Sequence, residues 1–339
     1  MQGTKVALGL APFDSILRRL ESDSAAVWGS RPVVLEPIAV TKRPSSSVLR
    51  VRVRSPERTF GAFIKIYEPV GEIGAQRHQL AADYRAAQNA HAHMSERGLG
   101  VAKPIACFPE SLAIVTEEAP GETLAALLRR ELRWSVSADG VRKLTAIFER
   151  IGAWLWAFQA RSRRPGALSL DGIREYLDDR LQLLVAMRAA GFDADRRNAA
   201  LRQFDSLAER VPPSHRVLVQ VHGDFCPENV LVDGERITVI DFAAERGSAL
   251  HDLTHLHCYM GTLYSKPWMS RATIDSLQQA LLRGYDRSLA PAEPLFQLLV
   301  MQHTVCQIVV QQTAGWGPLR LAYNRFLWSR HFRSIGASS

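Results

Sequence analysis

The hydrophobic pattern of the chain changes once, and this change limits the folds open to it. From Val33 to Tyr67 the sequence forms three β-type runs, over 33–40, 48–53 and 60–67, separated by turn-forming and polar residues. Beyond Pro120-Gly121, apolar residues recur mostly at helical spacing. Strands followed by helices are typical of α+β proteins. We therefore predict a two-lobed fold, with a small antiparallel sheet in an N-terminal lobe and a larger, mainly helical C-terminal lobe.

The expected lobes divide after Glu118, into residues 1–118 and residues 119–339. In the first lobe, Phe13 to Leu20 shows helical spacing, the alanine-rich segment 75–97 predicts a long helix, and 111–116 predicts another strand. In the second lobe, helices are predicted over 122–132, 137–160, 173–190, 196–211, 274–286, 294–312 and 319–332.

One β segment interrupts the helical part of the chain. It consists of the run 217–221 followed by two short apolar runs, 230–232 and 237–240, with Asp233-Gly234 between them. Asp-Gly between two such runs is a strong hairpin signal. Polar residues lie at both ends of this segment, so it is where we expect functional loops.

Composition excludes several classes of protein. The 339 residues are 47% hydrophobic and 22% charged, which is typical of a globular protein. The longest apolar stretch, 295–310, contains Gln and His and is too short to span a bilayer. The first residues of the sequence predict neither a secretion signal nor a transit peptide, and four cysteines without C-x-x-C spacing predict neither a disulfide scaffold nor a zinc ribbon. We expect a cytoplasmic protein without a membrane span.

The net charge of +8 is spread along the chain, without the basic stripe typical of nucleic-acid binders. We expect no nucleic-acid partner, and the oligomeric state stays open. Only six of the 42 Lys and Arg residues are lysine. Among the predicted strands of the N-terminal lobe, Lys65 is the only lysine.

Three polar residues around the predicted hairpin have a spacing that suggests phosphoryl transfer. The chain contains His222-Gly223-Asp224, then Asn229 after four intervening residues, and Asp241 directly after the second hairpin strand. Phosphoryl transfer needs a carboxylate at the acceptor and oxygen ligands for Mg²⁺. The hairpin would return Asp241 to the end where Asn229 lies. As an alternative, each residue could cap a turn or helix, but that role does not require this spacing.

This pattern, H-G-D-x4-N followed by I-D-F, resembles the aminoglycoside phosphotransferase and choline kinase-like family, relatives of the protein kinases. The resemblance extends over about residues 33–290, including the Asp-Leu pair at Asp252 and Gly284-Tyr285. It implies a protein-kinase-like fold, with Asp224 as catalytic base and Asp252 bracing the catalytic loop. His222 is counted among the nucleotide-binding residues. Asn229 and Asp241 would hold magnesium.

In the N-terminal lobe, the resemblance implies that Lys65 binds the nucleotide phosphates. An acidic residue on the next helix would orient it, either Asp83 in the usual place or Glu72. In place of a glycine-rich loop stand three serines, and Ser46 would bind phosphate unless 45–47 is a plain polar turn. The link 116–119 would contact adenine through its backbone, at Glu117 and Ala119.

The resemblance also implies an ATP- and Mg²⁺-dependent phosphotransferase acting on a small-molecule hydroxyl, with GTP not excluded as donor. An aminoglycoside would need carboxylates, such as those at 178–179 and 193–195. A choline-like cation would need an aromatic cage, and the candidate tryptophans are Trp154, Trp156, Trp268, Trp316 and Trp328. The positive charge favours a neutral or anionic acceptor such as a sugar or glycan. The alternatives are a pseudokinase or nucleotide-binding scaffold and a protein serine/threonine kinase; against the last, Ala243 follows Asp241-Phe242 where protein kinases have glycine.

Overall fold

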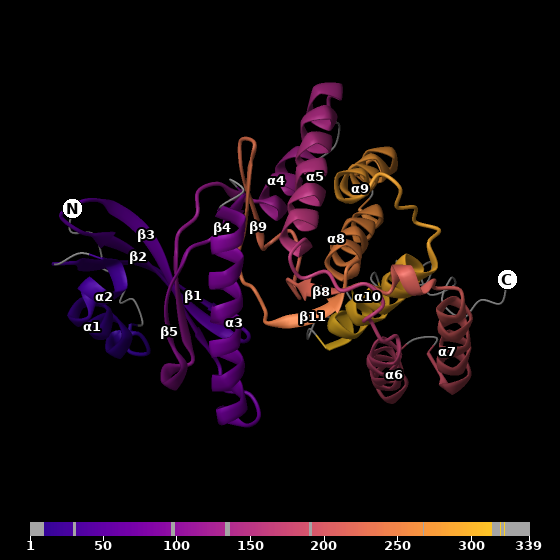
Figure 1. Cartoon of the computed structure of the whole chain (residues 1–339), viewed down its shortest axis with the longest axis horizontal. Helices are drawn as coiled ribbons and strands as arrows, with labels where there is room; N and C mark the ends of the chain where they lie inside the picture. The colour runs from indigo at the N-terminus through magenta and orange to yellow at the C-terminus, as the bar shows by residue number, and fades with distance from the viewer. Residues whose placement is uncertain are drawn as a thin grey trace. The chain divides into compact units, whose positions relative to one another are not determined.

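The computed structural model describes residues 10–29, 32–95, 99–132, 136–189, 192–266 and 268–313, together with Leu319 and Ala322 (Figure 1). Most of the helix predicted over 319–332, as well as Trp316 and Trp328, lies outside the described residues. The chain forms two compact units. The first consists of 1–123 and 229–244, and the second of 124–228 and 245–339.

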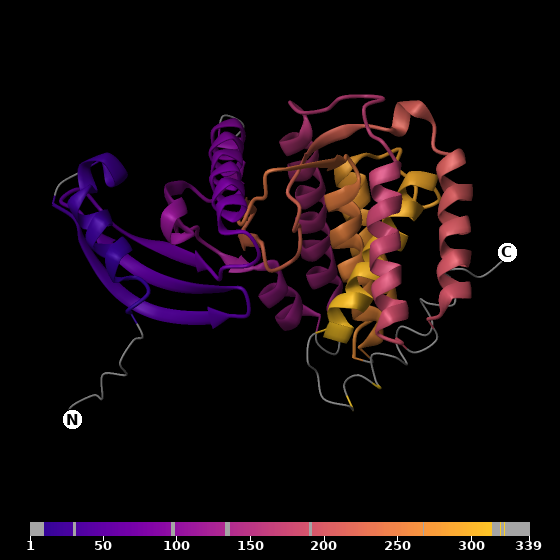
Figure 2. The same cartoon turned by 90° about the horizontal axis from the view of Figure 1, so that it is seen from below.

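A five-stranded antiparallel sheet forms most of the first unit. Its strand order is β1-β2-β3-β6-β5, and its strands are β1 (Val34–Arg43), β2 (Ser46–Arg54), β3 (Thr59–Tyr67), β5 (Pro104–Phe108) and β6 (Ala113–Glu117). Helices α1 (Asp14–Ser22) and α2 (Ser24–Trp28) precede it. Phe13, Ile16 and Leu20 bury their side chains in the same core as the strand residues, and Figure 2 shows α1 against the curved sheet. The N-terminal apolar pattern therefore serves packing.

The first unit also contains the long helix α3 (Ile73–Ser95), a short 3₁₀ turn (Pro109–Ser111) and a second sheet. That sheet has the order β4-β10-β9-β7, and its strands are β4 (Gly100–Val101), β7 (Glu122–Thr123), β9 (Val230–Asp233) and β10 (Arg236–Val239). The hairpin predicted around Asp233-Gly234 is confirmed, because β9 and β10 pair antiparallel across it.

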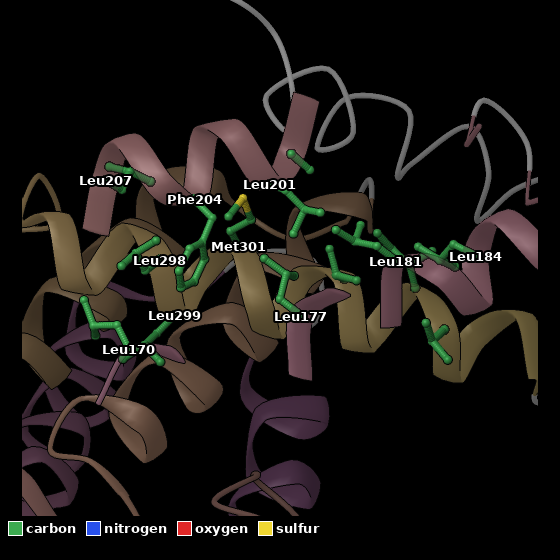
Figure 3. Close-up of a cluster of buried hydrophobic side chains, with 14 of the residues drawn as sticks. Leu170, Leu177, Leu181, Leu184, Leu201, Phe204, Leu207, Leu298, Leu299 and Met301 are labelled. Carbon is green, nitrogen blue, oxygen red and sulfur yellow. The ribbon is translucent and has the colours of Figure 1, made fainter. Parts of the chain in front are cut away.

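The second unit is mainly helical. Its helices are α4 (Leu124–Glu131), α5 (Ala138–Gln159), α6 (Asp171–Ala186), α7 (Ala194–Glu209), α8 (His251–Thr262), α9 (Arg271–Tyr285) and α10 (Pro294–Thr313), with 3₁₀ turns at Pro213–His215 and Leu263–Ser265. Strands β8 (Leu218–Val221) and β11 (Glu245–Ser248) pair antiparallel. Figure 3 shows leucines of α6, α7 and α10 packed together in its core. Together, the two units confirm the predicted α+β class, and no helix among the described residues has the length and apolarity that crossing a bilayer requires.

Helices α5 and α9 approach so closely that only glycine fits at two positions. A Cβ atom on Gly284 would lie 2.0 Å from the carbonyl oxygen of Glu149. A Cβ atom on Gly152 would lie 2.2 Å from the carbonyl oxygen of Leu281. Both obstacles are backbone atoms, so a side chain cannot simply move aside.

We expect Gly284→Ala to destabilise the protein by about 1–3 kcal/mol or more, the usual cost of overpacking. Denaturant unfolding monitored by circular dichroism would measure this loss. Gly172→Ala is the matched control, because nothing lies within 4 Å of a Cβ there and alanine favours a helix more than glycine does. Equal unfolding midpoints for the two variants would contradict the close contact.

Two histidines of the second unit, the buried His303 and the partly buried His257, should make its stability depend on pH. His257 packs edge-on against Phe296, with ring centroids 5.0 Å apart, and burial lowers its pKa to about 4. The unfolded chain, with a His pKa near ~6.5, binds a proton at a pH where the folded protein does not. We therefore expect the free energy of unfolding to fall between pH 7 and pH 5, by about 2 kcal/mol from this residue. Burial lowers the pKa of His303 as well, which acts in the same direction.

Denaturant titrations of the wild type and of His257→Gln at both pH values would test this expectation. The variant should lose less stability than the wild type when the pH falls. If the two proteins lost the same amount, His257 would not be the source of the dependence.

Candidate active site

The segment that carries the H-x-D motif is held by a buried carboxylate. Strand β8 ends directly before His222, and the backbone N–H groups of His222 and Gly223 donate to the two carboxylate oxygens of Asp252, at 2.7 and 3.0 Å. Asp252 is fully buried in the first turn of α8. Gly223 has a φ of 85°, a conformation that glycine adopts without strain. The expectation that Asp252 braces this loop is confirmed.

Two rings beneath the loop fix its position further. His222 is fully buried, and its Nδ1 accepts the N–H of Asp224 at 3.3 Å. The ring of His222 lies edge-on to Phe225, which stacks on Trp154 at 5.9 Å. Asp224 itself is exposed. The place of His222 among the nucleotide-binding residues therefore needs correction: the ring is enclosed by the protein and supports the loop.

The two expected metal ligands lie at one end of the hairpin in the first unit. The N–H of Ile240 donates to the carbonyl oxygen of Asn229 at 3.0 Å, and Asp241 follows directly. The prediction that the hairpin returns Asp241 to the end where Asn229 lies is therefore confirmed. Asp241 has a φ of 61°, in the left-handed region, which aspartate tolerates better than most residues.

Lys65 makes an ion pair with Asp241. Its Nζ lies 2.9 Å from Oδ2 of Asp241 and 4.8 Å from the ring centroid of Tyr67. Burial lowers the pKa of Lys65, but the charge of Asp241 and the contact with Tyr67 outweigh burial, so the pKa is raised and the group is protonated. Strand β1 extends further than predicted and includes Lys42, so Lys65 is not the only strand lysine of this unit. Lys42 is exposed, whereas the Lys65 side chain is only 20% exposed.

Neither expected acidic partner pairs with Lys65. Oδ1 of Asp83 accepts the backbone N–H of Ala244 and the side-chain amide of Gln79, both at 2.8 Å. Glu72 accepts the N–H groups of the first turn of α3, which lowers its pKa. The expected ion pair is therefore replaced by one with Asp241. Asp83 on α3 and Glu72 directly before α3 accept backbone N–H groups instead.

The serine turn differs from expectation at its central residue. Ser46 is the first residue of β2 and pairs with Tyr67, and it is 1% exposed. Burial of the Ser46 side chain disfavours the expected contact of its hydroxyl with a phosphate. Ser45, which precedes it, is exposed, and its carbonyl oxygen accepts the N–H of Glu68 at 2.9 Å.

The expected adenine-binding segment follows β6. The N–H of Glu117 donates to the carbonyl oxygen of Lys103 at 2.9 Å. The Glu117 carboxylate accepts hydrogen bonds from the two terminal nitrogens of the Arg58 guanidinium. The N–H of Glu118 donates to the carbonyl oxygen of Gly61 at 2.8 Å. Within the described residues, the N–H of Ala119 has no backbone acceptor.

Sequence reasoning missed Tyr67. Its signal was available, because residues two apart in a strand share one face and Tyr67 follows Lys65 at that spacing. Tyr67 is half-buried and its pKa is raised, mainly by burial. The ring gives the Lys65 ammonium a second contact besides its ion pair with Asp241.

The fold is shared with solved structures of small-molecule kinases. A glucosamine kinase matches 91% of this chain and 97% of its own, with a TM-score of 0.51 and 16% identity. Choline kinase from Cryptosporidium parvum Iowa II matches 95% of both chains, with a TM-score of 0.52 and 13% identity. Ethanolamine kinase from Plasmodium vivax matches 93% of this chain and 87% of its own, with a TM-score of 0.50 and 15% identity. These matches confirm the predicted kinase-like fold.

No curated protein sequence matches the chain. The model of the phosphotransferase enzyme family matches residues 41–295, which is 255 of the 339 residues. This range contains the motif loop, the hairpin and Lys65, the residues that carried the predicted resemblance. The prediction of an enzyme that transfers phosphoryl groups is thereby confirmed. The chain belongs to the phosphotransferase enzyme family.

Proposed function

We propose that this protein transfers the γ-phosphoryl group of ATP to a hydroxyl group of a small molecule, with Mg²⁺ as cofactor. The observation that carries the proposal is the loop at 222–224. Its backbone is fixed by Asp252 while Asp224 remains exposed. A carboxylate held in this way can accept the proton of a hydroxyl and orient its oxygen toward the phosphorus, the role of a general base.

The nucleotide would bind through the first unit. The Lys65 ammonium is a fixed point charge for the phosphate oxygens. Among the described residues, the N–H of Ala119 has no backbone acceptor, and we assign it to adenine together with the carbonyl oxygen of Glu117. GTP stays an alternative donor. Of the serine turn, Ser45 is exposed and Ser47 is half-buried, and we assign the phosphate contact to Ser45.

The residues present fit magnesium. Mg²⁺ prefers oxygen ligands and keeps several waters, and Asn229 and Asp241 offer an amide and a carboxylate oxygen at one hairpin end. The described residues contain no group of three His, Cys, Asp or Glu that could hold a metal, so phosphate oxygens and water would complete the coordination. When bound, the ion neutralises charge on the nucleotide phosphates.

We expect Asp241→Ala and Asn229→Ala to raise the magnesium concentration at half-maximal activity by about tenfold or more, equivalent to about 1.4 kcal/mol of binding. Asp241→Ala should have the larger effect, because it removes a charge. Magnesium titrations at fixed nucleotide would measure both. Asn89→Ala, at an exposed position of α3, is the control. If Asp241→Ala and Asn229→Ala gave the same magnesium titration curve as this control, the two residues would not be magnesium ligands.

The described acidic residues do not favour a polycationic acceptor. Asp178 is bound by the Arg197 guanidinium through both oxygens, at 2.6 and 2.7 Å, and this hydrogen bonding lowers its pKa. Asp193 caps the N-terminus of α7 by accepting the N–H of Arg196. Both candidate clusters for aminoglycosides are thus partly occupied by structural contacts.

Of the three described tryptophans proposed for a cation cage, Trp268 is 40% exposed, whereas the other two are engaged in contacts within the protein. Trp154 is fully buried between Phe158 and Phe225. One face of Trp156 carries the Arg163 guanidinium, 4.2 Å from the ring centroid. We therefore place neutral or anionic hydroxyl compounds such as sugars and glycans first, with aminoglycosides and amino alcohols after them.

A thermal-shift screen with Mg²⁺ and ATP, ADP or GTP tests the donor, because a ligand that binds only the folded state raises the melting temperature. Product assays with sugars, amino sugars, aminoglycosides, choline, ethanolamine and a serine-rich peptide then test the acceptor. No stabilisation by any nucleotide would contradict the proposal. Stabilisation without turnover on any acceptor would favour a nucleotide-binding scaffold, and peptide phosphorylation would favour a protein kinase.

All four cysteines are free thiols, which supports a cytoplasmic location.

A further inference from the structure

Helix α3 is tied to the segment that follows Asp241 by one side chain. Oδ1 of Asp83 accepts the backbone N–H of Ala244 at 2.8 Å. The side-chain amide of Gln79, one turn earlier on α3, donates to the same oxygen at 2.8 Å. This second bond holds the Asp83 carboxylate in place, so Ala244 is attached to a fixed point on the helix.

The segment held in this way is short and begins in an uncommon conformation. Asp241 has a φ of 61°, and Ala244 lies only three residues later. Non-glycine residues persist in such conformations only when their surroundings fix them. Phe242 is buried, which fixes one point of the segment, and the bond from Ala244 to Asp83 fixes a second.

Both groups that bind Asp83 are neutral donors. The cation that Asp83 was expected to orient, Lys65, pairs with Asp241 instead and contacts the ring of Tyr67. The two contacts therefore require an acceptor oxygen at position 83, but they do not require a negative charge there.

We propose that Asp83 is a positioning residue for Asp241: it fixes the segment 241–244 through the N–H of Ala244, so that α3 controls the proposed magnesium ligand rather than the proposed phosphate-binding lysine. The proposal rests on the proposed function for the role of Asp241. The contact itself concerns only the folded chain.

Three variants separate the two roles of Asp83. Asp83→Asn keeps the acceptor oxygen and removes the charge, whereas Asp83→Ala removes both and keeps a good helix former on α3. Asn89→Ala is the control for loss of a polar side chain at an exposed position of the same helix. Melting temperatures would verify that all three variants fold.

The first measurement is hydrogen exchange of the Ala244 amide in the nucleotide-free protein. We expect slow exchange in the wild type, Asp83→Asn and Asn89→Ala, and faster exchange in Asp83→Ala by about 2- to 13-fold, the factor that corresponds to one hydrogen bond. This measurement needs neither nucleotide nor turnover, so it stays readable if the proposed function fails.

The second measurement is the Mg²⁺ concentration needed for half of the thermal stabilisation by ADP, together with kcat. We expect Asp83→Ala to raise this Mg²⁺ concentration by about 2- to 13-fold and to lower kcat. In Asp83→Asn, both quantities should lie within about twofold of the wild-type values. If Asp83→Asn behaved like Asp83→Ala, the charge would be the essential feature and the proposal would be overturned. Unchanged Ala244 exchange in Asp83→Ala would overturn it as well.

Discussion

Replacing Asp224 by asparagine is expected to lower kcat by about 10²-fold or more, because a positioned general base contributes about 10²–10⁴-fold. Asparagine has nearly the same shape and keeps an oxygen, but it cannot take the proton of the acceptor hydroxyl. The loop should stay folded, since its hydrogen bonds to Asp252 involve the backbone of the two preceding residues. Steady-state kinetics with the best acceptor would measure kcat, and a thermal shift with Mg·ADP would measure nucleotide binding.

The matched control is Asp14→Asn, which makes the same chemical change at an exposed position in the first turn of α1. It should leave kcat unchanged. An unaltered kcat in Asp224→Asn would show that another group accepts the proton. A large loss of nucleotide affinity in this variant would show that Asp224 acts on the donor instead.

The long strands and the main helices were predictable because each carries a periodic apolar face. Strand β3, for example, begins one residue before the predicted run 60–67 and ends with it. Its inward residues Ala62 and Ile64 are fully buried, and this burial is what the pattern reports.

The short strands were not predictable in the same way. Strand β11 has the sequence Glu-Arg-Gly-Ser and only one buried residue, so it carries no apolar alternation. Strand β7 contains two residues, Glu122 and Thr123, which the sequence assigned to the following helix. Such strands exist because a partner strand offers hydrogen bonds, and a single sequence does not show which partner is near.

The candidate site shows the same division. Spacing along the chain predicted the relation of Asn229 to Asp241, because a two-residue turn leaves few ways to pair the strands between them. The partner of Lys65 depends instead on how α3 and the segment 241–244 pack, which spacing does not determine. Ser46 was misjudged for a related reason: β2 begins two residues earlier than predicted and takes Ser46 into the sheet.

The expected result for Lys65→Ala is a loss of about 10²–10³-fold in kcat/KM, the usual effect of removing one fixed electrostatic stabiliser. The Lys65 ammonium is a point charge on a strand of the sheet, held at 2.9 Å from Asp241. Lys65→Arg should also lower kcat/KM substantially, because the longer planar guanidinium cannot occupy the place of an ammonium between Asp241 and the phosphates. Kinetics at saturating acceptor, with ATP varied, would measure both variants.

Lys42 provides the matched control, since it is an exposed lysine on β1 of the same sheet. Lys42→Ala and Lys42→Arg should both keep wild-type kinetics. Because the contacts of Lys65 are to Asp241 and Tyr67 rather than to Asp83, the losses in Lys65→Ala should be strongly non-additive with those in Asp241→Ala, as expected for two groups in direct contact. Wild-type rates for Lys65→Arg would instead assign this lysine to the solvated surface, where either cation serves equally well.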